Sequence, residues 1–109
     1  MGGIQRLHIG KAAVGMLTKT LAMEAAPYGV RVLALAPGAV KTAINQSVWS
    51  DPKKLRDLLT KIPVGRMGEV KEIAQMAALL VSDAASYMTG ATVYVDGGMT
   101  LYANFERGG

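Results

Sequence analysis

The stretch whose residue types and spacing best suit ligand binding is Pro37-Gly38-Ala39-Val40-Lys41-Thr42. It directly follows residues 32–36, an unbroken apolar run that favours a parallel strand covered on both faces. Pro37 has no N–H for a continuing ladder, and Gly38 can adopt backbone angles closed to other residues, so a sharp turn is predicted. Ligands of open α/β sheets bind at this carboxyl end of the strands. The turn is a candidate binding loop, although a Pro-Gly turn after any buried strand is the competing interpretation.

Three other polar or glycine-rich positions are candidates for chemistry of their own. His8 has an intrinsic pKa suited to proton transfer, but a lone histidine near a chain end is more simply an exposed one. Asp96 has no second ligand near it in the sequence, so we expect it to bond loop backbone rather than a metal ion. Gly97-Gly98 is not followed by the residues of a phosphate-binding loop, so it predicts a plain turn. The sequence therefore predicts no metal site.

The elements that must position the loop begin with a helix. Residues 11–26 carry apolar side chains three to four apart, which predicts a helix with a wide apolar face that ends at Pro27. Residues 1–9 show no periodicity and contain two adjacent glycines, so we expect no regular structure there. After the candidate loop, residues 44–50 are loop-like and contain Trp49.

Two further helices and a second strand are predicted downstream. Ser50-Asp51-Pro52 has the form of a helix start. The helix that it begins carries an apolar stripe and is expected to stop before Pro63. Residues 69–82 have helical spacing, and residues 91–95 form an apolar strand. Strand, helix and strand make a βαβ unit with a right-handed connection, which is typical of an α/β fold with a parallel sheet.

Composition excludes several classes of protein. A chain of 109 residues that is 50% hydrophobic is at most one globular domain. The absence of cysteine excludes disulfides and agrees with a reducing compartment, so the cytoplasm is expected. No apolar run is long enough for a membrane span, and the chain has no signal-peptide core. The net charge of +4 comes from scattered basic residues, which favours a solvated surface over nucleic-acid binding.

Four motifs, in this order, resemble the short-chain dehydrogenase/reductase family. They are Gly10-Lys11-Ala12-Ala13-Val14, Pro37-Gly38-x-x-x-Thr42, Gly65-Arg66-Met67-Gly68-Glu69-Val70, and Met88-Thr89-Gly90 leading to Val95-Asp96-Gly97-Gly98. The tail from Asp96 to Tyr102, followed by Phe105, is most similar to the glucose 1-dehydrogenase branch. The resemblance implies the C-terminal half of a Rossmann-like, doubly wound parallel sheet. Residues 1–109 would be a single, incomplete domain in which residues 43–64 form the substrate lid.

The resemblance also implies a chemistry. The family oxidises alcohols or reduces carbonyls with NAD or NADP, using a tyrosine acid/base four residues before a lysine. Lys11 matches that lysine by its context, but Leu7 stands at the tyrosine position and has no proton to transfer. His8 is one position away, about 100° around a helix, and is not expected to replace the tyrosine. Lys11 could otherwise simply reach into solvent.

For the candidate loop, the resemblance implies contacts with the nicotinamide. Pro37 and Gly38 would line the pocket, the backbone at Val40 would bond the carboxamide, and Thr42 would support the carboxamide or a phosphate. The sequence does not specify the substrate or the choice between NAD and NADP.

Two functional hypotheses follow. The first is the C-terminal portion of an NAD(P)-dependent short-chain oxidoreductase acting on alcohol or carbonyl groups, possibly of a sugar such as glucose. This portion would be inactive alone, because the catalytic tyrosine and the glycine-rich cofactor turn are missing. The second is a non-catalytic module that associates with itself or with subunits of the family through residues 12–23 and 91–102.

Overall fold

The computed structural model describes residues 3–101 of the chain, with side chains described from residue 14 onward. The chain divides into two compact units, one built from residues up to 35 with 79–93, the other from 36–78 with residues from 94 onward. Strands β1 (Ala34–Pro37) and β4 (Thr92–Val95) pair with each other, and each contributes its first half to the first unit and its second half to the second.

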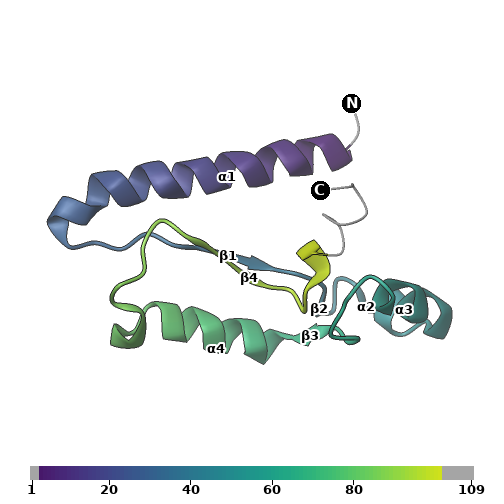
Figure 1. Cartoon of the computed structure of the whole chain (residues 1–109). Helices are drawn as coiled ribbons and strands as arrows, with labels where there is room; N and C mark the ends of the chain where they lie inside the picture. The colour runs from purple at the N-terminus through teal and green to yellow at the C-terminus, as the bar shows by residue number, and fades with distance from the viewer. Residues whose placement is uncertain (1–2, 102–109) are drawn as a thin grey trace. The chain divides into compact units, whose positions relative to one another are not determined.

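The first unit opens with the long helix α1 (Gly3–Ala25), followed by a 3₁₀ turn, Ala26–Tyr28 (Figure 1). Gly29, with φ of 73°, closes the turn by donating its N–H to the Ala26 carbonyl. The prediction of no regular structure is wrong for residues 3–9, because the helix already begins at Gly3, while residues 1 and 2 lie outside the described residues. The glycine at position 10 did not stop the helix, since a glycine inside a helix costs only about 1 kcal/mol relative to alanine.

The first halves of β1 and β4 are joined in parallel order in this unit. Gly90 donates its N–H to the Val32 carbonyl at 2.8 Å, and Ala34 donates to the Ala91 carbonyl at 3.1 Å. On α1, Thr18 and Ala22 are buried, and the space opposite Ala22 is small because a Cβ on Gly90 would lie 3.5 Å from the Ala22 Cβ. The helix and the turn that precedes β4 therefore meet through small residues.

The second unit carries the short elements that surround the candidate loop. These are β2 (Val40–Lys41), α2 (Gln46–Trp49), α3 (Pro52–Leu59) and β3 (Gly68–Glu69), which leads directly into α4 (Val70–Leu80) (Figure 1). The predicted start of α3 is confirmed, because the Asp51 carboxylate accepts the N–H groups of Lys53 and Lys54 at 3.0 and 3.3 Å. The loop predicted for residues 44–50 is wrong, because one helical turn, α2, forms there.

A second short parallel pair joins β2 to β3, with Val40 opposite Gly68 and Lys41 opposite Glu69. Gly68 donates its N–H to the Ala39 carbonyl at 2.9 Å. The order of helix, strand, short helices, helix and strand agrees with the predicted incomplete α/β fold. Among residues 3–101, no helix has both the length and the apolar character needed to cross a membrane.

Candidate functional site

The candidate loop begins at the end of β1, whose last residue is Pro37, one residue beyond the predicted run. Gly38 continues the contact with β4 by donating its N–H to the Val95 carbonyl at 3.1 Å. The reason given for Gly38 is wrong, because its φ is not among the positive values found at other glycines. Glycine is needed for space instead: a Cβ there would lie 2.6 Å from the Cβ and 2.7 Å from the Cα of Asp96.

Asp96, against which Gly38 packs, is held in a fixed turn. Its carboxylate accepts the Gly98 N–H at 2.9 Å, the Thr100 N–H at 3.1 Å, and the Thr100 hydroxyl. Burial opposes ionisation of this group, but the hydrogen bonds from Thr100 and Gly98 hold the pKa of Asp96 below its usual value. Gly97 and Gly98 both have positive φ. The predicted backbone-bonding role of Asp96 and the predicted turn are both confirmed.

Beyond Gly38, the side-chain amide of Asn45 holds the loop. Its Nδ2 donates to the Val40 carbonyl at 2.7 Å. Its Oδ1 accepts both the Thr42 N–H at 2.9 Å and the Thr42 hydroxyl at 3.1 Å. One amide therefore bridges two of the four residues for which the family resemblance implies nicotinamide contacts.

Trp49, at the end of α2, supports the same segment from a second direction. Its Nε1–H donates to the Thr42 carbonyl at 2.8 Å. The Lys41 ammonium lies 5.2 Å from the centroid of the Trp49 ring, within the range of a cation–π interaction. We call the side chains of Asn45 and Trp49 the Asn45–Trp49 clasp. Sequence reasoning missed both residues, although the closeness of an asparagine to Thr42 is a recognised signal for side-chain-to-backbone bonding.

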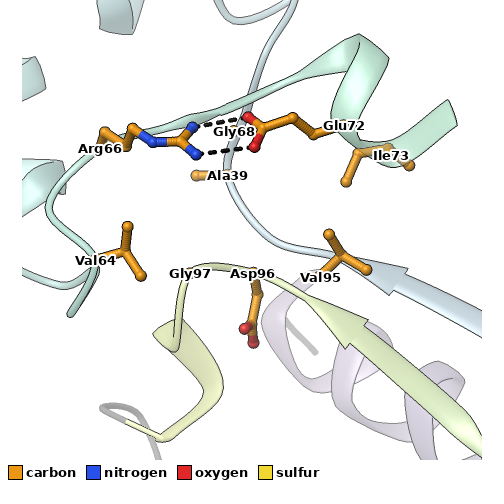
Figure 2. Close-up of a pocket in the computed structure, with 9 residues that line it drawn as sticks. All are labelled: Ala39, Val64, Arg66, Gly68, Glu72, Ile73, Val95, Asp96 and Gly97. Carbon is orange, nitrogen blue, oxygen red and sulfur yellow. Dashed lines mark hydrogen bonds and ion pairs between the residues drawn. The ribbon is translucent and has the colours of Figure 1, made fainter. Parts of the chain in front are cut away.

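A small cavity of about 120 Å³ lies in this unit beside Ala39 and the Asp96 turn. Figure 2 shows its lining and the Asp96 carboxylate directed away from the pair formed by Arg66 and Glu72. Ligand pockets usually measure roughly 300–1,000 Å³, so this cavity is too small to enclose a dinucleotide. The lining residues are Ala39, Val64, Arg66, Gly68, Glu72, Ile73, Val95, Asp96 and Gly97.

Arg66 and Glu72 form a bidentate ion pair across the start of α4 (Figure 2). The Nη1–Oε1 and Nη2–Oε2 distances are 2.7 and 2.8 Å. Glu72 also accepts the Glu69 N–H at 2.9 Å, and Arg66 donates to the Met67 carbonyl at 3.1 Å. The hydrogen bonds from Arg66 and from the Glu69 backbone lower the pKa of Glu72 to about 2. The pair thus links the segment before β3 to the first turn of α4 after it, and β3 is the strand that pairs with Val40.

Pro37, Gly38, Val40 and Thr42 all lie in the second unit. Lys11 and Leu7 lie in α1, which belongs to the first unit. Their side chains are outside the described part of the structure. The proposed catalytic role of the Lys11 position therefore stays a prediction.

Known proteins match almost the whole chain. A family model described as enoyl-(acyl carrier protein) reductase matches residues 2–100. The chain is 53% identical to 3beta-hydroxysteroid dehydrogenase 1 of Eggerthella lenta over 90% of its own length, and 48% identical to the glucose 1-dehydrogenase of Gluconobacter oxydans over 89%. Among solved structures, it is similar to a gluconate 5-dehydrogenase from Burkholderia cenocepacia in complex with NADP and tartrate. That similarity has a TM-score of 0.75 at 38% identity and covers 84% of this chain and 36% of the other.

The matched region is a minor part of each relative. The chain covers 38% of the length of the Eggerthella protein and 36% of the Gluconobacter protein. The chain thus spans less than two fifths of the length of these curated relatives.

The ion pair at the start of α4 predicts a pH-dependent stability. The folded-state pKa of Glu72 is about 2, against an ordinary value of 4.5, so its stabilising contribution is present above about pH 4.5 and is lost as the pH falls toward 2. We expect Glu72→Gln to lower the urea midpoint of unfolding at pH 7 and to lose this effect near pH 2. The same substitution in an Arg66→Gln background should show much less pH dependence. An effect of Glu72→Gln that stays constant from pH 2 to 7 would contradict the prediction.

Proposed function

Because the chain belongs to the short-chain dehydrogenase/reductase family, we propose that residues 37–42 form the nicotinamide-facing loop of an NAD(P)-dependent oxidoreductase acting on alcohol or carbonyl groups. The observation that carries the proposal is the fixed geometry of Val40 to Thr42 at the carboxyl end of β1. Four hydrogen bonds hold this segment to the Asn45–Trp49 clasp, two donated by Thr42 and two donated by the clasp. Carboxyl ends of parallel strands are where open α/β sheets bind nucleotides.

The hydrogen-bonding groups of the loop fit a primary amide. Because Gly68 bonds the Ala39 carbonyl and successive peptide groups alternate in direction, the Val40 carbonyl points away from β3. The Val40 carbonyl therefore lies on the side that β3 does not cover, where it accepts from Asn45. A carboxamide carries an NH₂ group, which suits the remaining acceptor lone pairs of the Val40 carbonyl and the Thr42 hydroxyl.

The roles of individual residues follow from that fit. Val40 and Thr42 would hold the carboxamide, and Pro37 and Gly38 would line the ring. Lys11 would hold the ribose, as its position in the family implies. A bound nicotinamide would supply the hydride chemistry, whereas these residues bind and orient it.

The proposed substrate is an alcohol or carbonyl group of a small molecule, for which a sugar such as glucose is the first candidate. The support is the 48% identity to a glucose 1-dehydrogenase. Residues 43–64, which include α2 and α3, would be the lid over that substrate. Residues 1–109 would form one partial domain of the complete enzyme.

The proposed loop can be tested with nicotinamide mononucleotide, which lacks the adenosine half of the cofactor. We expect the largest amide chemical-shift changes in the ¹⁵N spectrum at Val40 and Thr42. Thr42→Val should weaken binding roughly tenfold, because about one hydrogen bond is lost. The control is Thr20→Val, since Thr20 is an exposed threonine on α1, outside the loop and the proposed lid, and should not affect binding. Absent shifts at Val40 and Thr42, or equal effects of the two variants, would reject the loop.

The chain by itself should not turn over substrate. Leu7 lacks the proton of the tyrosine, and the 109 residues contain no glycine-rich turn to hold the pyrophosphate. We expect no NAD- or NADP-dependent oxidation of glucose by the purified chain above a blank. Leu7→Tyr should stay inactive, because it restores only the proton donor. Turnover clearly above the blank by either protein would show that the expectation is wrong.

A second candidate function, self-association, is favoured by an exposed apolar stripe on α1. Val14, Leu17 and Leu21, at helical spacing, are 54%, 56% and 42% exposed. Exposed apolar patches on soluble proteins often mark interaction sites, and a stable contact buries roughly 800 Å² on each partner. Residues 12–23 could then supply a large part of an interface with a second copy or a related subunit.

A charge in the middle of this stripe should weaken association. We expect Leu17→Glu to shift sedimentation velocity profiles toward the monomer across a wide range of concentrations. Met16→Glu is a matched control, because Met16 is 72% exposed but points away from the stripe. Identical profiles for the two variants would remove the stripe from the proposed interface.

A further inference from the structure

Asn45 directs its side chain away from the helix that it precedes. It occupies the cap position of α2 but makes no side-chain cap hydrogen bond to that helix. Asparagine at a helix start normally accepts an N–H from the first turn of its own helix. Here all three of its side-chain bonds instead run backward along the chain, to Val40 and Thr42. Its amide is therefore used by the candidate loop rather than by the helix.

The chemistry of its partners fixes the orientation of the Asn45 amide. The Val40 carbonyl can only accept, so the NH₂ group must face it. The Thr42 N–H can only donate, so the amide oxygen must face that residue. The Thr42 hydroxyl lies 3.1 Å from this same oxygen and must donate its single proton to it.

This arrangement leaves Thr42 with one kind of hydrogen-bonding capacity. Its N–H and hydroxyl proton are committed to Asn45, and its carbonyl accepts from Trp49. The hydroxyl oxygen keeps its lone pairs, so Thr42 can accept a hydrogen bond from a ligand. It cannot donate to a phosphate oxygen without breaking its bond to Asn45.

We propose that Asn45 is a positioning residue that fixes Thr42 as a hydrogen-bond acceptor, so that the loop selects the NH₂ group of a carboxamide over an anionic oxygen. The inference rests on the proposed function of residues 37–42 and assigns a specificity to it. Asn45 itself would not need to touch the ligand, because it acts through Thr42 and Val40.

Hydrogen exchange of the ligand-free chain tests the positioning step. We expect Asn45→Ala to speed exchange of the Thr42 amide at least tenfold, because its only acceptor is removed. Gln46→Ala, a change at an exposed neighbouring residue, should leave that rate within about twofold. Equal rates in the two variants, or a Thr42 amide that is already unprotected in the wild type, would overturn the proposal.

Asn45→Asp should give a pH-dependent chemical shift, which a general loss of structure would not produce. Its carboxylate can still accept from Thr42 but cannot donate to Val40, whereas the protonated acid can do both. We expect the Thr42 amide to stay protected throughout. The ¹³C shift of the Val40 carbonyl should move away from its wild-type value at neutral pH and return toward it as the pH falls through about 4. A carbonyl shift that ignores pH in this variant would overturn the donor role of Asn45.

The specificity step is tested with nicotinamide mononucleotide and nicotinic acid mononucleotide, which differ in an amide against a carboxylate. We expect the wild type to prefer the amide at least tenfold and Asn45→Ala to lose most of this preference, since the Thr42 hydroxyl can then donate. An unchanged preference would overturn the proposal. Failure of nicotinamide mononucleotide to bind the wild type would instead overturn the proposed function, while the exchange rates would still decide the role of Asn45.

Discussion

The close approach of Gly38 to Asp96 is the contact on which the candidate loop depends. β1 and β4 pair, and at the end of that pairing the chain after β1 passes so near the Asp96 backbone that no side chain fits at position 38. Asp96 cannot easily move aside, because its carboxylate is bonded to the N–H groups of Gly98 and Thr100. The starting point of the loop is thereby fixed, and the clasp only has to hold the three residues from Val40 to Thr42.

Polar contacts carry an unusual share of this organisation. Within the described residues, only five hydrophobic side chains are buried: Ala22, Ile62, Met67, Leu80 and Ala85. Burial of apolar surface is the main stabilising term in most folds, so a small set of buried groups leaves more to hydrogen bonds. In the second unit Ile62 and Met67 supply such burial, and Met67 directly follows Arg66. The ion pair of Arg66 with Glu72 and the Asn45–Trp49 clasp add contacts with specific partners to that burial.

The sequence predicted the parts of this structure that follow from local chemistry. Asp51 before Pro52 predicts a capped helix start, and the apolar run before Pro37 predicts a strand, although β1 begins two residues later than expected. The pairing of β2 with β3 could not be predicted, because two residues carry no periodicity and their partners are distant in the sequence. The sequence suggested that position 38 needs glycine for its backbone freedom. The actual reason, the nearness of Asp96, depends on the folded chain and could not be read from the sequence. Asn45 was missed for a similar reason: its bonds depend on the path of the loop.

The single tryptophan of the chain stands at an informative place. The Trp49 indole N–H bonds the Thr42 carbonyl, and its ring lies beneath the Lys41 ammonium. Indole fluorescence responds to hydrogen bonding and to nearby charge, so both contacts would affect the emission of Trp49. Trp49 is therefore a fluorescent reporter on the candidate loop, and no second tryptophan in the chain contributes to the emission. Opening and closing of the segment around Thr42 could be followed in real time without attaching a dye.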